Sequence, residues 1–203
     1  MPIINMVYKK KKWWKPWANT IAYFPFENDT ADHSGNGVTL TTTSTPIQQS
    51  IGYKFTWQTS ISSNQVKTVS VWIKMITWGD TTWIATQDCH YICYYYTHDS
   101  GLWQNFVILN QHITANATTN ANTWYNIITV VDTANNKTYG YINGVKYMDY
   151  SGVWNNLGSW IWLMGSANNN GEWILSDCII ESVARTDQEV LDYYNNTKWT
   201  YGL

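Results

Sequence analysis

Short apolar and aromatic segments alternate with clusters of turn residues along most of the chain. In residues 67–76, Val69, Val71 and Ile73 share one side of an extended chain while Ser70 falls on the other, as in a half-buried strand. Similar segments recur about every 10 to 12 residues, a spacing typical of β-sandwiches. The predicted strands are residues 21–26, 38–45, 54–57, 67–76, 81–87, 90–97, 103–110, 124–132, 137–144, 160–166 and 172–184.

Two local signals add a tight turn and a short helix to this pattern. Asn143 and Gly144 separate two strand-like segments, and both tolerate the positive φ that a type I′ hairpin turn requires. Near the C-terminus, Thr186 and Glu189 form a capping box, which predicts a helix with an apolar face made of Val190, Leu191 and Tyr194.

These elements together predict an all-β sandwich with a short C-terminal helix. Residues 1–18, MPIINMVYKKKKWWKPWA, show no amphipathic period, and Pro16 disfavours a helix through their end. We therefore expect an extended N-terminal arm over residues 1–19 and one β-sandwich domain over residues 20–203.

The composition supports this fold class and excludes others. Aromatic residues make up 16% of the 203 residues and charged residues only 13%, while 25 Thr and 21 Asn supply most of the polar surface. A chain with so much apolar area and so few charges is not intrinsically disordered. It also lacks the Ala, Glu, Lys and Leu of a helical bundle, and its Thr, Trp and Tyr favour strands.

The net charge of −2 conceals two parts of opposite sign. Five of the twelve positive charges lie between residues 9 and 15, whereas residues 16–203 carry seven positive and fourteen negative charges, a balance of −7. The arm is therefore expected to have a function separate from that of the acidic body.

Nothing in the sequence is typical of a secreted or membrane-spanning chain. Three cysteines are too few, and odd in number, for a disulfide framework. No stretch approaches the roughly 18 apolar residues of a spanning helix, and the basic N-terminus is not followed by the apolar region of a signal peptide. We expect synthesis in a cytoplasm without a secretory signal.

Four segments in order resemble the laminin-G-like, concanavalin A-like jelly-roll domains of many microbial and viral surface proteins. Residues 21–37 are similar to that family's opening strand and D-x-S-G-N-G loop, and residues 67–75 to its S-x-S-x-W-V-K strand. Residues 122–147 resemble its hairpin pair, and residues 173–195 its closing strand and short helix. The resemblance implies a two-sheet antiparallel jelly-roll sandwich. Residues 77–115 and the arm fall outside it.

The resemblance also implies a Ca²⁺ site at an edge of the sandwich, at Asp32 of the D-x-S-G-N-G loop. Asp29 and Asp32 lie in a loop rich in oxygen ligands, which suit Ca²⁺, and Asp177 in the closing strand is a third candidate ligand. The family's acidic pair appears here as Ser176-Asp177, so one carboxylate is missing. The alternative is that Asp32 and Ser34 only hydrogen-bond the turn backbone.

Carbohydrate binding is the common role in the resembled family, and it needs exposed aromatic rings beside amides and carboxylates. Several loops combine such residues, and the alternative is that they are ordinary loop surface or are buried against a neighbouring subunit. The candidate glycan-binding residues are Trp78, Asp80, Trp103, Asn105, Trp154 and Asn169.

An enzymatic function is not expected. The four glutamates do not form the E-x-D-x-x-E strand signature of the glucanases that share this fold, and no nucleophile elbow, zinc-protease motif or phosphate loop is present. Cys89, His90 and Cys93 are zinc-ligand types, but on a strand His90 points away from the two thiols. We therefore expect these cysteines to be free and buried.

The arm combines positive charges with rings that can stack. Its residues are Lys9, Lys10, Lys11, Lys12, Trp13, Trp14, Lys15 and Trp17. This pairing suits single-stranded nucleic acid, and it resembles the arms of capsid proteins of small single-stranded DNA viruses. The arm could also anchor the protein to an acidic neighbouring subunit or an anionic surface, or be a solubilising tail.

The leading hypothesis is an oligomeric, non-enzymatic protein of a virion or other extracellular particle, of the kind found on phage and other viruses. The sandwich would be displayed as a capsid decoration or fibre for glycan or receptor binding, and the arm would dock it to other virion subunits. The alternatives are a stand-alone carbohydrate-binding module of a secreted or cell-surface protein and a capsid protein whose arm binds the genome.

Overall fold

The computed structural model describes residues 18–42, 45–55, 59–62, 66–77, 81–86, 91–97, 104–110, 113–118, 120, 122–152, 160–165 and 172–203. Its helical elements are α1 (Asp187–Thr197) and the 3₁₀ helix η1 (Lys198–Tyr201). Its strands are β1 (Thr20–Phe24), β2 (Leu40–Thr42), β3 (Ile47–Gln48), β4 (Tyr53–Phe55), β5 (Thr59–Ser62), β6 (Thr68–Thr77), β7 (Thr81–Thr86), β8 (Tyr91–Thr97), β9 (Gln104–Asn110), β10 (Ile113–Thr118), β11 (Trp124–Asp132), β12 (Lys137–Ile142), β13 (Val145–Ser151), β14 (Trp160–Gly165) and β15 (Glu172–Glu181).

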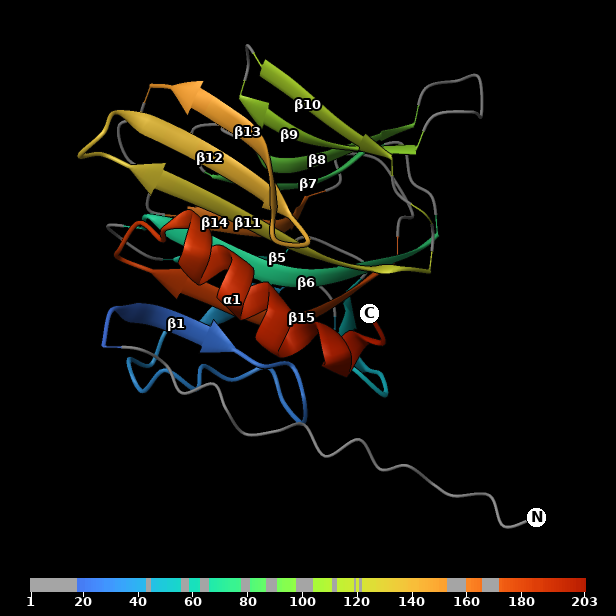
Figure 1. Cartoon of the computed structure of the whole chain (residues 1–203). Coiled ribbons are helices and arrows are strands. Elements are labelled where there is room, and N and C mark those ends of the chain that lie inside the picture. Colours follow the sequence, from blue (N-terminus) through green and yellow to red (C-terminus); the bar gives the residue numbers. More distant parts are fainter. Residues whose placement is uncertain are drawn as a thin grey trace.

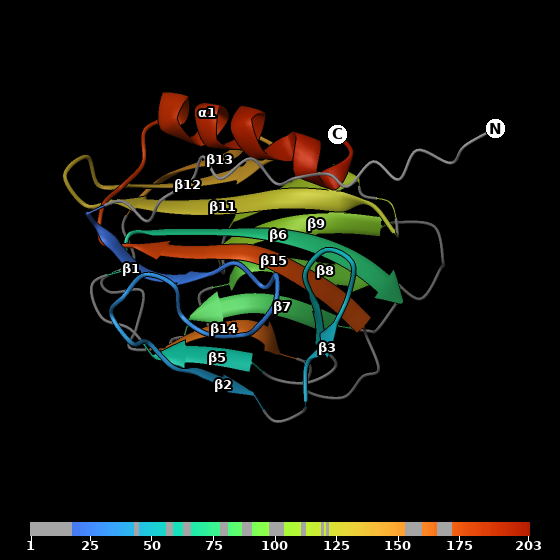
Figure 2. The same ribbon diagram turned by 90° about the horizontal axis from the view of Figure 1, so that it is seen from below.

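The strands form two antiparallel sheets that pack face to face. One sheet has the order β13-β12-β11-β6-β15-β4-β3, with β1 also paired to β15, and the other has the order β10-β9-β8-β7-β14-β5-β2. Figure 1 shows α1 crossing the front of the first sheet, and Figure 2 shows the three layers in the order helix, first sheet, second sheet. The predicted two-sheet sandwich with a short C-terminal helix is confirmed. No helix among the described residues is long and apolar enough to cross a membrane.

The main core lies between the two sheets. Alternate residues of β6, including Val71, Ile73 and Met75, point into it and are almost completely buried. Ile61 of β5 packs into the same cluster from the second sheet. Burial of this apolar surface, at about 25 cal/mol per Å², is the main driving force for joining the two layers.

A second core lies on the outer face of the first sheet, beneath α1 and η1. Trp72 and Trp124 pack there with Ile174 and Tyr201, and Trp72 is completely buried. The expectation that residues 67–76 are only half buried is wrong, because side chains on both faces of β6 are buried. Trp72 has the parity of Ser70, not of the valines, so it points to the side that the C-terminal segment covers.

The local signals in the sequence form the turns and caps that they predict. Asn143 and Gly144 have φ values of 51° and 76°, as the hairpin between β12 and β13 requires. The hydroxyl of Thr186 accepts from the Glu189 amide, and the Glu189 side chain accepts from the Thr186 amide, which completes the capping box of α1. The predicted strands do not include β3, β5, β10 and β13.

Gly52 in the turn between β3 and β4 offers a test of how closely this edge packs. Its φ is +80°, and a Cβ there would strike the Leu175 carbonyl oxygen and lie 2.8 Å from Ile174 Cγ2. Gly35 has a φ of +90° with no atom within 4 Å of such a Cβ. The two positions therefore separate backbone strain from steric overlap.

We expect Gly52→Ala to lower the free energy of unfolding by about 3 kcal/mol, because it adds a clash with backbone to the strain of positive φ. Gly35→Ala should cost about 1 kcal/mol from the backbone alone. Urea denaturation of both variants measures the difference. Equal losses would mean that the β15 backbone moves aside without cost.

Candidate functional site

Asp32 organises the loop that follows β1. Its Oδ1 accepts from the backbone amides of Tyr23 at 3.0 Å and Ser34 at 2.9 Å. Its Oδ2 accepts from the Ser34 hydroxyl at 2.8 Å and the Val38 amide at 2.9 Å. Partial burial raises the pKa of the Asp32 carboxyl, but these four hydrogen bonds together outweigh it and hold the pKa below its usual value.

Asp29 lies in the same loop but faces solvent. Its Oδ1 accepts from the Ala31 amide at 3.0 Å and lies 2.9 Å from Nε2 of His33. The hydrogen bond with His33 is the main reason why the pKa of the Asp29 carboxyl is lowered. Because both side chains of this pair are about half exposed, the pair contributes little to stability.

Asp177 lies at a bulge in β15, where that strand changes partners. Residues 173–175 of β15 pair with β4 and residues 178–181 with β1, and the register against β6 shifts between Ser176 and Ile179. Asp177 has a φ of 46°, and its amide donates to the Pro25 carbonyl at 3.2 Å. The bulge thus turns the Asp177 side chain out of the regular alternation of the strand.

Two tyrosine hydroxyls hold the buried Asp177 carboxylate. Tyr23 donates to Oδ1 at 3.0 Å and Tyr201 donates to Oδ2 at 2.6 Å, while only 7% of Asp177 is exposed. Burial, followed by the charge of Asp177, raises the pKa of both phenols, so both remain protonated donors at neutral pH. The carboxylate therefore ties the first strand to the C-terminal end.

The three candidate calcium ligands are not brought together as one oxygen cluster. The Tyr23 residue separates the two carboxylates, because its backbone binds Asp32 and its hydroxyl binds Asp177. Among the described residues, no group of three His, Cys, Asp or Glu side chains could hold a metal ion. The alternative expectation, hydrogen bonding of Asp32 and Ser34 to the turn, describes the observed geometry. Calcium binding in this loop stays a prediction.

The other predicted site residues fall mostly outside the described part of the chain. Trp78, Asp80, Trp103, Trp154 and Asn169 lie there. Asn105 lies on β9, opposite Tyr96 of β8 and Thr118 of β10, with its side chain not described. The docking-arm residues from Lys9 to Trp17, and Cys89 with His90, also lie outside the described residues.

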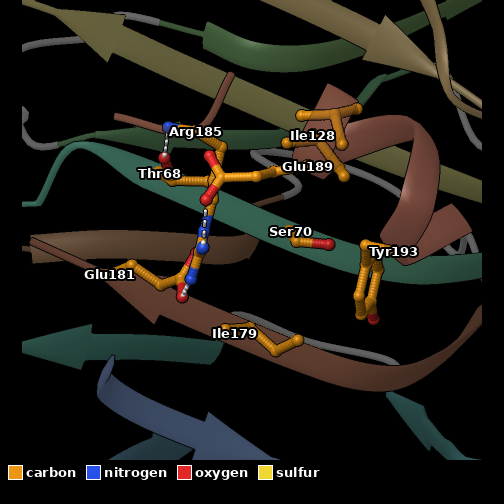
Figure 3. Close-up of a pocket in the computed structure, with 9 residues that line it drawn as sticks. Thr68, Ser70, Ile128, Ile179, Glu181, Arg185, Glu189 and Tyr193 are labelled. Atoms are coloured by element: carbon orange, nitrogen blue, oxygen red, sulfur yellow. Dashed lines mark hydrogen bonds and ion pairs between the residues drawn. The ribbon is translucent and has the colours of Figure 1, made fainter. Parts of the chain in front are cut away.

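A small pocket lies between α1 and the outer face of the first sheet (Figure 3). At one end Arg185 donates to both carboxylate oxygens of Glu181 and, through Nη1, to Glu189 at 3.1 Å. The Arg185 and Glu181 side chains are only 8% and 4% exposed. The pocket holds about 20 Å³, room for one water molecule but not for a sugar. Through these contacts Arg185 joins the first turn of α1, at Glu189, to β15, at Glu181.

An exposed aromatic surface at the C-terminal end of α1 was not predicted from the sequence. We call Tyr194, Asn195, Lys198 and Trp199 the C-terminal patch. Trp199 is 67% exposed, and the Lys198 ammonium lies 5.2 Å from its ring centroid and 5.3 Å from that of Tyr194. The same ammonium donates to Asn195 Oδ1 at 3.0 Å. A helix ending in KWTY was the available signal, since helical spacing separates Trp199 from the buried Tyr201.

Binding domains of toxins share this fold over most of the chain. The binding domain of botulinum neurotoxin DC, solved with rat synaptotagmin II, is 15% identical with a TM-score of 0.65, over 90% of this chain and 52% of that chain. Botulinum neurotoxin type C, which depends on two ganglioside molecules to enter cells, is 14% identical with a TM-score of 0.63, over 88% and 51%. The binding domain of Paraclostridial Mosquitocidal Protein 1 is 17% identical with a TM-score of 0.61, over 87% and 52%.

These comparisons define the class of fold. They confirm a jelly-roll β-sandwich and do not support the narrower laminin-G-like assignment. The chain spans about half the length of these neighbours. Its sequence matches no family model and no curated protein.

Asp32→Asn should destabilise the protein at neutral pH by about 2 kcal/mol, because an amide accepts fewer and weaker hydrogen bonds than the carboxylate. The pKa of Asp32 is lowered in the folded state, so its contribution is complete above the unfolded pKa of about 4 and is lost as pH falls through the folded pKa. The stability difference between parent and variant should shrink below pH 4 in denaturation curves. Asp192→Asn, at an exposed helix position, is the matched control. A difference that is constant from pH 7 to pH 2 would contradict this assignment.

Tyr201→Phe should cost about 2 kcal/mol of unfolding free energy, because it leaves one oxygen of a buried carboxylate without its donor. Tyr147→Phe removes a hydroxyl from a tyrosine that is 45% exposed and should cost less than about 0.5 kcal/mol. Thermal and urea denaturation of the two variants test the contrast. Equal stability of Tyr201→Phe and the parent would show that the hydroxyl contributes nothing at Asp177.

Proposed function

We propose that this chain is a non-enzymatic binding protein of a virion or other particle surface. Its sandwich recognises a glycan or protein receptor, and its N-terminal arm docks it to the particle. The observation that carries the binding half is the fold shared with toxin binding domains, two of which engage synaptotagmin II and gangliosides. These identities are low, so the ligand class is carried over as part of the proposal.

The state of the buried carboxylates supports a non-catalytic role. A glycoside hydrolase needs two carboxylates that face a common space, one as acid and one as base or nucleophile. Among the described residues, Asp177 is held by two phenols, and Glu181 by the Arg185 guanidinium. These groups stabilise the fold, and the pocket beside Glu181, as far as the described residues define it, holds about 20 Å³, too little for a sugar.

The sequence of the arm supports the docking half. Five lysines and three tryptophans within residues 9–17 give it a charge opposite to that of the body. An acidic surface on a neighbouring virion subunit would attract it, and assembly would then be sensitive to salt. Genome binding by the same residues is the alternative within this function, because lysines neutralise phosphates and tryptophans stack on bases.

A stand-alone carbohydrate-binding module is the second candidate function. The effect of deleting the arm distinguishes this function from that of a particle-surface protein, since a module that acts alone has no need of a docking segment. The fold and the exposed aromatic surface are compatible with both.

Deleting residues 1–18 should abolish incorporation into particles while leaving binding to glycans or receptor-bearing cells unchanged, because the sandwich begins at Thr20. Co-sedimentation with particles and cell-binding assays measure the two effects. Replacing Lys9 to Lys12 with Gln should weaken incorporation more than replacing Lys67 and Lys74 of the body. Incorporation that survives the deletion would overturn the docking role. Single-stranded DNA binding with a salt slope of about −3, lost in the deletion, would favour the genome-binding alternative.

A further inference from the structure

We propose that the C-terminal patch binds a sugar that carries a carboxylate, such as a sialic or uronic acid. The inference rests on the proposed binding function and assigns to it a site and a ligand class. It follows from three properties of the patch: an exposed ring, a cation with no acidic partner in the described part of the chain, and a rigid support.

Trp199 supplies the exposed ring. It is the most exposed of the large apolar side chains in the described part of the chain, at 67%, although Tyr201 two residues later is only 6% exposed. An indole face carries negative electrostatic potential and attracts the weakly positive C–H groups of a pyranose ring. Asn195 is exposed beside it and offers an amide N–H for a sugar hydroxyl.

Lys198 supplies the charge. Its ammonium contacts the Asn195 oxygen and the two rings, and it forms no ion pair within the described residues. Two other cations near α1 have acidic partners, Lys146 in Asp187 at 2.7 Å and Arg185 in Glu181 and Glu189. An anionic group arriving at Lys198 therefore displaces no existing salt bridge.

Asp192 is the acidic residue of α1 closest to Lys198 in sequence, and it faces another direction. Six residues at 100° each place it about 120° around the helix and about 9 Å along it. It accepts instead from Gln188 Nε2 at 2.8 Å. Lys198 is thus the charge at the patch that attracts a carboxylate, acting against the weakly negative C-terminal end of α1.

The rings beneath the patch hold it in place before any ligand arrives. Tyr194 stacks on Trp72 with ring centroids 5.9 Å apart, and Trp72 stacks on Tyr201 at 3.9 Å. The hydroxyl of Tyr201 is bound by the buried Asp177. A platform anchored to the core loses little conformational entropy on binding, which favours affinity for a small ligand.

The surroundings favour a sugar over a lipid surface. The exposed positions of α1 next to the patch are Leu191, Asp192 and Asn196, so Leu191 is the one apolar side chain among them. A membrane-binding helix needs a wide apolar face with lysines and arginines along its polar side. The amides of Asn195 and Asn196 instead suit a polyhydroxylated ligand.

The test compares the full chain with Trp199→Ala and Lys198→Gln for binding to immobilised 3′-sialyllactose, a glucuronic-acid-terminated oligosaccharide and lactose. We expect the parent to bind at least one acidic sugar more tightly than lactose. Trp199→Ala should weaken that binding about tenfold or more, and Lys198→Gln should remove only the preference for the acidic sugar. Tyr147→Ala, an exposed tyrosine on β13 outside the patch, should bind as the parent does.

The same set of variants also tests whether the substitutions disturb folding and whether other ligands bind the patch. Trp199→Ala should keep the parent melting temperature, because the ring is largely exposed. Acidic-sugar binding that is unchanged in Trp199→Ala, or a parent that binds lactose equally well, overturns the inference. Binding to phosphatidylserine vesicles that is lost in Trp199→Ala, without sugar binding, overturns it in favour of a lipid.

Cell binding separates failure of this site from failure of the proposed function. Parent protein that binds cells through a protease-sensitive receptor, with binding unchanged after sialidase and glucuronidase treatment of the cells, overturns the acidic-sugar site and leaves the receptor-binding function standing. Parent protein that binds neither cells nor any of the sugars overturns both.

Discussion

The outer face of the eight-stranded sheet must be covered, and much of the structure follows from this requirement. Trp72 projects from the middle of β6 on the side away from the second sheet, and an exposed indole there would leave a large apolar surface in water. Tyr201 covers it with a stacked ring at 3.9 Å, and Trp124 packs against the same tyrosine with centroids 4.9 Å apart. The C-terminal helix and the 3₁₀ turn are therefore part of the core of the sandwich.

Tyr201 also contacts the bulge that interrupts β15. The bulge at Asp177 turns a carboxylate toward Tyr201 and Tyr23, so that one buried acid binds both the last turn and the first strand. Asp32 continues the connection, because it accepts from the Tyr23 amide. Acidic residues that stand out in the sequence as oxygen ligands thus serve as hydrogen-bond acceptors for the chain itself. The oxygens of Asp32 accept from residues of its own loop and of β1, whereas those of Asp177 accept from Tyr23 and Tyr201, at the two ends of the sandwich domain.

Covering the core also determines what is left on the surface. Helical spacing turns Tyr194 and Tyr201 inward over Trp72 and leaves Trp199 outside, with Lys198 between the rings. A structural requirement at one side of the C-terminal segment therefore produces a rigid aromatic surface at the other. The sequence predicts binding residues in the loops between strands instead, because tryptophans lie there beside amides and carboxylates.

Local chemistry was sufficient for the features that depend on a few adjacent residues. Residues 124–132 are rich in β-branched and aromatic residues and form β11, Asn143-Gly144 tolerates positive φ and forms the hairpin, and the Thr186 capping box starts α1. Tertiary structure alone decided which face of β6 is covered, that Asp177 lies between two phenols, and that Trp199 rather than Tyr201 is exposed. The reason is physical: strand and turn preferences act over a few residues, whereas burial depends on which distant segment packs against each face.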